Sequence, residues 1–109
     1  MTIEAAGSRR PWTLLSNHGH VLVYLARHPD PVMREIAAGV GITERAAQGI
    51  VHDLAEYGYI TIHRVGRRNS YAINTALPLR HPDEADHTVG ELLATFTEPL
   101  PPSAAGATA

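Results

Sequence analysis

The residues best suited to chemistry lie in one short segment and on one face of a predicted helix. The stretch 60–74 contains three arginines and no acidic residue. Guanidinium groups stay charged and bind phosphate oxygens through paired N–H donors. The helix face adds polar groups that can bind phosphates or base edges. The candidate DNA-binding residues are Arg34, Thr43, Glu44, Arg45, Gln48, His52, Arg64, Arg67 and Arg68.

Other kinds of site find weaker support in the sequence. The chain has seven histidines, including His18, His20 and two in the segment 81–87, but their spacing matches no zinc motif. The absence of cysteine excludes Cys-ligated zinc and thiol catalysis. No nucleophile–base pair, phosphate loop or paired-carboxylate motif stands out. We therefore expect no metal, no cofactor and no enzymatic activity.

Three helices are expected ahead of the arginine-rich stretch. The first runs from Ser16 or Asn17 to Arg27, and the second covers 34–40. The third begins after Thr43, a good N-cap, and continues to about Tyr57. Its apolar residues recur at i, i+3, i+4 and i+7, which predicts one buried face made of Ala47, Ile50, Val51 and Leu54.

Beyond Gly58, which is expected to end the third helix in a left-handed conformation, the pattern changes to a period of two. Alternation at 60–64 and 70–74 predicts a β-hairpin whose basic turn is 65–69. A last helix starts at Thr88, which forms a capping box with Glu91. This helix carries an apolar stripe that we expect to form a dimer interface, made of Val89, Leu92, Leu93 and Phe96.

Length and composition limit the possible architectures. The chain has 109 residues, of which 44% are hydrophobic and 18% charged, and this suits one small globular domain. No apolar run is long enough to cross a membrane, and the first fifteen residues lack a secretory pattern, so a cytoplasmic protein is expected. The net charge of −2 is uneven, because residues 80–109 hold five acidic residues and one arginine. The expected segments are a flexible tail (1–11), a DNA-binding domain (12–77), a linker with a C-terminal dimerisation helix (78–97) and a disordered tail (98–109).

The order helix, turn, helix and basic hairpin is that of a winged helix-turn-helix, an α+β fold with a three-helix core and a β-hairpin wing. The segment 34–60, with its turn Gly41-Ile42-Thr43, resembles the core of MarR- and ArsR-type regulators. The segment 64–71 is similar to their wing in position and length. The resemblance covers roughly 18–75 and implies a bacterial transcriptional regulator that binds double-stranded DNA as a homodimer. The chain lacks the long flanking helices of MarR members and the cysteine motif of metal-sensing ArsR members.

In this interpretation the helix that follows Thr43 enters the major groove, and the wing contacts phosphates or the minor groove. The surface that carries Arg45 and the loop that carries Arg67 must then face the same way. One alternative is a winged helix that serves as a protein–protein adaptor, which the net negative charge favours. Another is a sensor in which a small molecule or metal regulates DNA binding.

Overall fold

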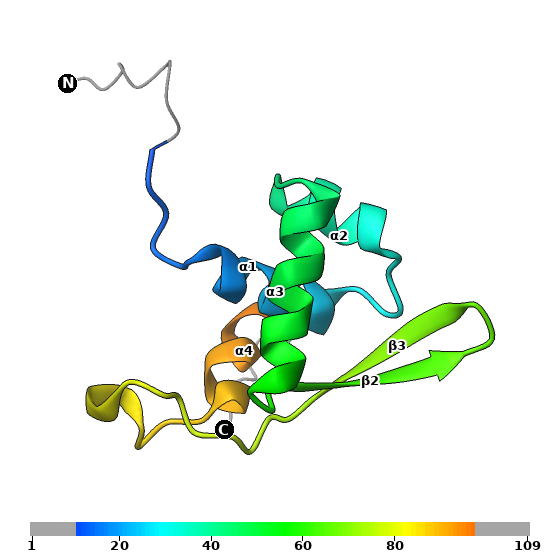
Figure 1. Cartoon of the computed structure of the whole chain (residues 1–109). Coiled ribbons are helices and arrows are strands. Elements are labelled where there is room, and N and C mark those ends of the chain that lie inside the picture. The colour runs from blue at the N-terminus through cyan, green and yellow to red at the C-terminus, as the bar shows by residue number, and fades with distance from the viewer. Residues whose placement is uncertain (1–10, 98–109) are drawn as a thin grey trace.

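Figure 1 shows the arrangement of the chain in a computed structural model, which describes residues 11–97. Within this range four α-helices, one short 3-10 helix and a two-stranded antiparallel sheet are present, so the predicted α+β class is confirmed. The expected tails, apart from Pro11, lie outside the described residues. The elements are α1 (Asn17–Arg27), α2 (Met33–Val40), α3 (Glu44–Glu56), β2 (Ile60–Val65), β3 (Arg68–Ile73), η1 (Pro82–Glu84) and α4 (Val89–Thr97).

Hydroxyl side chains cap the starts of α1 and α3, as the sequence predicts. At α1 the Ser16 hydroxyl accepts the N–H of Gly19 at 3.2 Å. At α3 the Thr43 hydroxyl accepts the N–H of Ala46 at 3.0 Å. Each of these bonds satisfies a backbone donor that the helix itself leaves without a partner. The two starts are therefore fixed by local sequence.

The start of α2 is formed differently, because Val32 has no side-chain acceptor. Here the Glu35 carboxylate accepts the backbone N–H of Val32 at 2.9 Å, and the helix begins at Met33, one residue earlier than predicted. At its other end Gly41 has a φ of 89°, which glycine adopts without a Cβ penalty. This conformation turns the chain directly into α3, so α2 and α3 form a tight helix pair.

The core lies where α1, α2 and α3 meet, and α4 and the first residue of β2 complete it (Figure 1). Each helix buries one apolar stripe there, as expected for amphipathic helices. All four apolar residues predicted for α3 are buried, which confirms that face. The buried core residues are Val21, Leu22, Leu25, Ile36, Ala37, Ala47, Ile50, Val51, Leu54, Ile60, Val89 and Leu93.

The hairpin of β2 and β3 leaves the body of the molecule soon after it begins. Ile60 is buried, whereas the other five residues of β2 are exposed. Strand pairing runs from Ile60 opposite Ile73 to Val65 opposite Arg68. The turn is therefore only Gly66 and Arg67, and the predicted five-residue turn 65–69 is wrong. Gly66 has a φ of 63°, which suits the tight two-residue turns that join right-twisted strands.

The last helix packs on its own chain with two of the four residues predicted for a dimer interface. Val89 is fully buried and Leu93 is 4% exposed, both in the common core against α1. These two residues therefore have little surface left for a second copy, and their predicted role at a dimer interface stays a prediction. Leu92 and Phe96, the other two predicted contacts, remain half-buried.

Two helical glycines predict opposite effects of the same substitution on stability. A Cβ at Gly49, within α3, would meet nothing within 4 Å. Gly49→Ala should therefore raise the free energy of unfolding by about 0.5–1 kcal/mol, because alanine loses less backbone entropy than glycine. A Cβ at Gly39, in α2, would collide with the ring of Tyr24, and Gly39→Ala should lower stability by about 1–3 kcal/mol. Urea denaturation of both variants measures the difference, and equal effects would contradict this packing.

The start of α4 carries the predicted capping box together with a pH-dependent contact. The Thr88 hydroxyl accepts the N–H of Glu91 at 3.1 Å, and the Glu91 carboxylate accepts the N–H of Thr88 at 2.9 Å. His87 Nδ1 also lies 2.9 Å from that carboxylate. The hydrogen bond from Thr88, followed by that from His87, lowers the pKa of Glu91. The hydrogen bond to Glu91, followed by the charge of Asp86, raises the pKa of His87.

These shifts predict how the contribution of His87 to stability changes with pH. A raised pKa in the folded state means that protonated His87 stabilises the fold fully below its ordinary value of 6.5. This stabilisation is lost as the pH rises through the higher pKa of the folded state. The lowered pKa of Glu91 makes its own contribution full above 4.5 and lost in acid. The melting temperatures of the wild type and His87→Gln should therefore differ most between pH 4.5 and pH 6.5. They should converge in alkaline buffer. A difference that persists unchanged above neutrality would contradict the contact.

Candidate nucleic-acid interface

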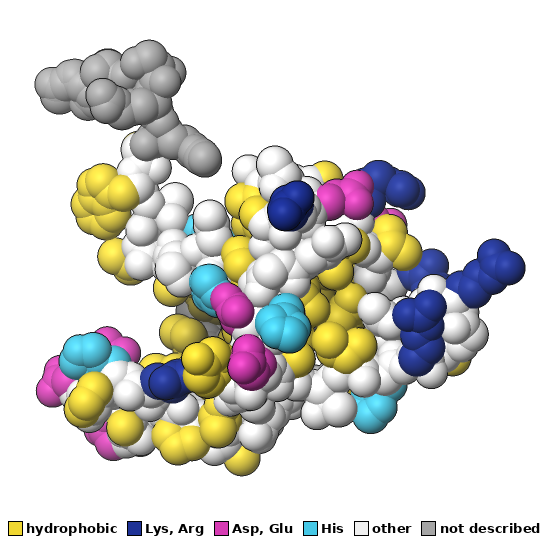
Figure 2. Space-filling view, in the orientation of Figure 1, with side chains coloured by type: hydrophobic (Ala, Val, Ile, Leu, Met, Phe, Trp, Pro, Cys, Tyr) yellow, Lys and Arg dark blue, Asp and Glu magenta, His cyan; other side chains and the backbone are white. Residues whose placement is uncertain are grey.

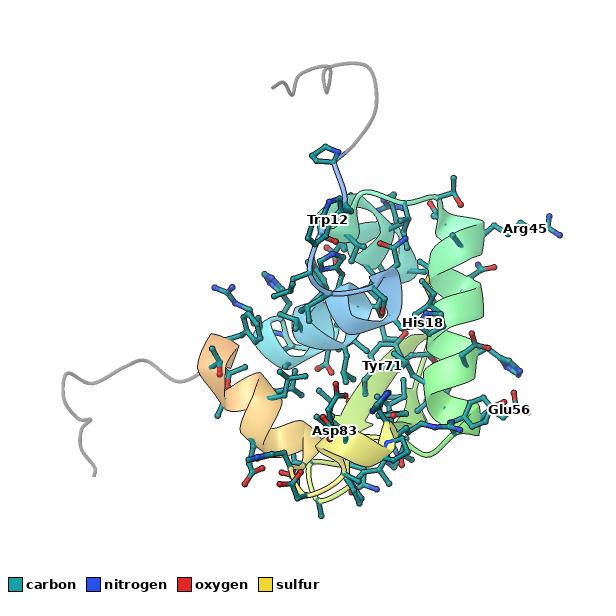
Figure 3. All side chains as sticks on the ribbon, turned by 90° about the vertical axis from the view of Figure 1, so that its left-hand side faces the viewer. Trp12, His18, Arg45, Glu56, Tyr71 and Asp83 are labelled. Carbon is teal, nitrogen blue, oxygen red and sulfur yellow. The ribbon has the colours of Figure 1, made fainter. Side chains whose placement is uncertain are left out.

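The outward face of α3 presents a line of exposed polar side chains. Arg45, Gln48, His52 and Glu56 are all exposed, and their spacing places them on the side opposite the buried stripe. Figure 3 shows Arg45 pointing away from the body of the molecule, and Glu56 near the other end of the same helix. Gly49 lies between them and leaves the backbone of α3 uncovered. This face can approach a partner surface closely.

The charge on this face changes from one end of α3 to the other. Near its start Arg45 is exposed, and Arg34 on α2 is exposed in the preceding helix of the pair. Near its end lie two carboxylates that are both in contact with histidines. Asp53 lies 2.8 Å from His18, and Glu56 lies 3.5 Å from His52. The arginines therefore lie at the N-terminal half, each next to an exposed carboxylate, Glu44 beside Arg45 and Glu35 beside Arg34, and there the helix dipole also favours anions.

The hairpin tip provides the second basic element. Arg67 forms half of the two-residue turn and is exposed. Arg64 is held across the tip, where its Nε donates to the carbonyl of Gly66 at 3.3 Å and its Nη1 to Asn69 Oδ1 at 3.4 Å. These bonds engage only part of the guanidinium group, which has five donors. The remaining donors are available for a phosphate.

Arg68 has a structural contact that the sequence did not predict. Its guanidinium donates to the backbone carbonyl of Asp30, in the loop between α1 and α2, at 2.6 Å. Asp30 has a φ of 45°, an uncommon conformation for a residue with a side chain. The bond ties the hairpin to the helical body and orients it. Arg68 therefore positions the hairpin, and only its remaining donors can contact a ligand.

The arginines of the described residues have no carboxylate partners. Four ion pairs are present in the range 11–97, and histidine is the cation in each of them. In Figure 2 most of the basic side chains lie at the end of the body where α2 and α3 meet and along the hairpin, and one lies beside the loop that contains η1. Acidic side chains lie over the segment that contains η1, over the middle of this view, and beside the basic side chains where α2 and α3 meet. The protein thus offers guanidinium groups that are not in contact with a carboxylate within the described range.

All nine predicted DNA-binding residues are exposed, and they come from three parts of the chain. Arg34 belongs to α2, and the three arginines at 64, 67 and 68 belong to the hairpin. The other five residues, from Thr43 to His52, lie at the start and on the outward face of α3. The sequence did not identify the exposed apolar residues beside the hairpin arginines, Ile62 and Val65, which are 39% and 65% exposed. The only signal for them was the lack of strict alternation in β2, where apolar residues fall on both faces.

Two further features bear on the alternatives. No group of three or more histidine, cysteine or acidic residues that could hold a metal ion occurs among residues 11–97. In the same part of the chain, no helix combines the length and apolar character needed to cross a membrane.

Comparison of the chain with models of protein families, with curated proteins and with solved structures yields no match.

Proposed function

We propose that this chain is a winged helix-turn-helix protein that binds double-stranded DNA as a homodimer and regulates transcription. The observation that carries the proposal is the set of arginines on α2, α3 and the hairpin, which have no carboxylate partner within the described residues. Arginine without an internal partner is suited to phosphate, because its fork of N–H donors matches phosphate oxygens. The arrangement of the helix pair and hairpin in Figure 1 supports the same function.

In the proposed complex α3 lies in the major groove, which is about 12 Å wide and accommodates one helix. Arg45 and Gln48, both exposed on the outward face, contact base edges. Gly49 lets the backbone come close, because no side chain separates it from the DNA. Thr43 and Glu44 lie at the entrance, and the N-terminus of the helix contributes its dipole to phosphate binding.

The hairpin then follows the DNA backbone beside the groove. Arg67 at the turn and the uncommitted donors of Arg64 contact phosphates or the minor groove, where the potential attracts arginine. The bond from Arg68 to the carbonyl of Asp30 fixes the angle between hairpin and body. Because few cations are available, we expect moderate affinity with a clear dependence on salt.

A homodimer would place two copies of α3 in successive major grooves, about 34 Å apart along the duplex. With Val89 and Leu93 buried, the apolar surface available for a second copy is elsewhere. Trp12 and Leu14, which precede α1, are 84% and 89% exposed, and large exposed apolar side chains are typical of interfaces. Half-buried Phe96 and Leu15 line a common hollow on the surface, which extends this apolar region.

The proposal is tested by selection of bound sequences from a pool of random duplexes. A regulator should enrich a sequence with two related half-sites separated by about one helical turn. Anisotropy titrations with the enriched duplex should show binding that weakens steeply as salt is raised. Equal affinity for the enriched and scrambled duplexes at every salt concentration would contradict sequence-specific binding.

The second candidate function is a protein–protein adaptor. It is favoured by the same exposed Trp12 and Leu14 and by Val65 at the hairpin, which would serve a protein partner as well as a second copy. The selection separates the two functions. An adaptor would enrich no sequence and would bind duplex DNA weakly or not at all.

A further inference from the structure

We propose that the pocket between α1, the C-terminal half of α3 and α4 binds a small, mostly apolar molecule that carries one anionic group. The pocket has a volume of about 570 Å³. This value lies within the usual range for small-molecule sites. In Figure 2 the hollow lies between the helical body and the loop that contains η1. The assignment of a ligand here does not rest on the proposed DNA binding.

The inner surface of the pocket is apolar and is built from the edge of the core. Leu22 of α1, Leu54 of α3 and Val89 of α4 lie directly beneath its inner surface, where each belongs to the buried core and is almost fully covered. Leu92 of α4 and Tyr59 add half-buried walls. Three elements fixed by a common core therefore hold the lining in place, so a ligand would enter a largely formed site.

Of the charged groups in the pocket lining, Arg80 is the one that can hold an anion. Arg80 lies with its guanidinium carbon 4.6 Å from the centre of the Tyr57 ring, and it has no carboxylate partner among the described residues. The carboxylate in the lining, Asp53, is already engaged by His18 at 2.8 Å. An anionic group next to Arg80 would gain a charge-assisted hydrogen bond, while the apolar part of the molecule covers the half-buried lining residues Leu79, Leu92 and Tyr59.

The segment 77–89 presents Arg80 at this place. It is closed by backbone hydrogen bonds from Leu79 N–H to the carbonyl of His87 at 3.0 Å and from Val89 N–H to the carbonyl of Leu77 at 2.8 Å. Leu77 and Leu79 pack against the core, so the base of the loop is anchored. Arg80 follows directly and lies against α3 through Tyr57. The loop thus sets a cation at the entrance of an apolar pocket.

The test uses two fluorescent probes of nearly the same shape on the full chain. The anionic probe is 8-anilinonaphthalene-1-sulfonate, and the neutral one is N-phenyl-1-naphthylamine. We expect the anionic probe to bind the wild type with a stoichiometry of one and more tightly than the neutral probe. Arg80→Gln should weaken the anionic probe about tenfold and leave the neutral probe unchanged. Leu92→Ala should weaken both several-fold, because both lose the same apolar contact.

Arg27→Gln is the matched control, because Arg27 is exposed and lines the separate hollow that contains Phe96. It should leave both probes unaffected. Near-UV circular dichroism confirms that each variant keeps its tertiary structure before it is titrated. The assignment is overturned if the wild type gives no saturable binding, if Arg80→Gln binds the anionic probe as the wild type does, or if Arg27→Gln weakens it instead. It is also overturned if the wild type binds no probe and Leu92→Ala converts a dimer to a monomer, because a second copy then covers the pocket.

Discussion

Replacement of both Arg45 and Arg67 by glutamine is expected to weaken binding to duplex DNA about 10- to 100-fold near 0.1 M salt. The two residues come from the two elements that we propose to contact DNA, α3 and the turn of the hairpin. If each neutralises one phosphate, their loss should also reduce the magnitude of the salt slope by about 2. Anisotropy titrations of wild type and variant at four or five salt concentrations measure both quantities.

The single variants and a matched control locate the effect. Arg45→Gln and Arg67→Gln should each account for part of the loss, whereas Arg27→Gln, at the end of α1, removes the same charge from another element and should change affinity little. All three variants have the same net charge, so a general electrostatic effect would weaken them equally. Equal weakening by the three, or an unchanged salt slope in the double variant, would argue against the proposed contacts.

Truncation of Leu93 is expected to be the most destabilising single change in α4. Leu93 is 4% exposed and belongs to the core, and Leu93→Ala should lower the free energy of unfolding by about 2–5 kcal/mol. Small domains are stable by only about 5–15 kcal/mol, so this change should shift the urea midpoint clearly. The cause is the loss of apolar contacts together with the cavity left against α1.

Leu92→Ala is the natural comparison, because it removes the same atoms from the neighbouring, half-buried position. Leu92→Ala should lower the free energy of unfolding by less than half as much as Leu93→Ala, because part of the Leu92 side chain already contacts water. If instead both variants keep wild-type stability while the oligomeric state changes, α4 serves a partner rather than its own core. Equilibrium denaturation together with sedimentation distinguishes these outcomes.

Local sequence was sufficient to predict the four α-helices and the caps of α1, α3 and α4, but not the start of α2 or the short helix η1. Ser16, Thr43 and the pair Thr88–Glu91 act through residues three positions away, so their hydrogen bonds follow from short spacing alone. The period of α3 correctly indicated its buried side. The residues of α3 that do not belong to the buried stripe were predicted to face outward, and all the candidate residues among them are exposed.

Contacts between distant parts of the chain could not be predicted in this way. The stripe on α4 indicated that one side must be covered, but the period of a helix does not specify what covers it, and Val89 and Leu93 pack against α1. The partner of Arg68 is a backbone carbonyl 38 residues away, and a carbonyl has no sequence signature. The pocket beside Arg80 likewise depends on three elements that meet only in the folded chain.

Amide chemical-shift mapping of the ¹⁵N-labelled protein with the selected duplex shows whether α3 and the hairpin turn contact DNA together. We expect the largest shifts at Arg45, Gln48 and Gly49 of α3 and at Gly66 and Arg67 of the turn. The acidic segment around η1 should show little change. Shifts centred on that segment or on α4, with α3 and the turn unaffected, would show that DNA does not bind to α3 and the hairpin.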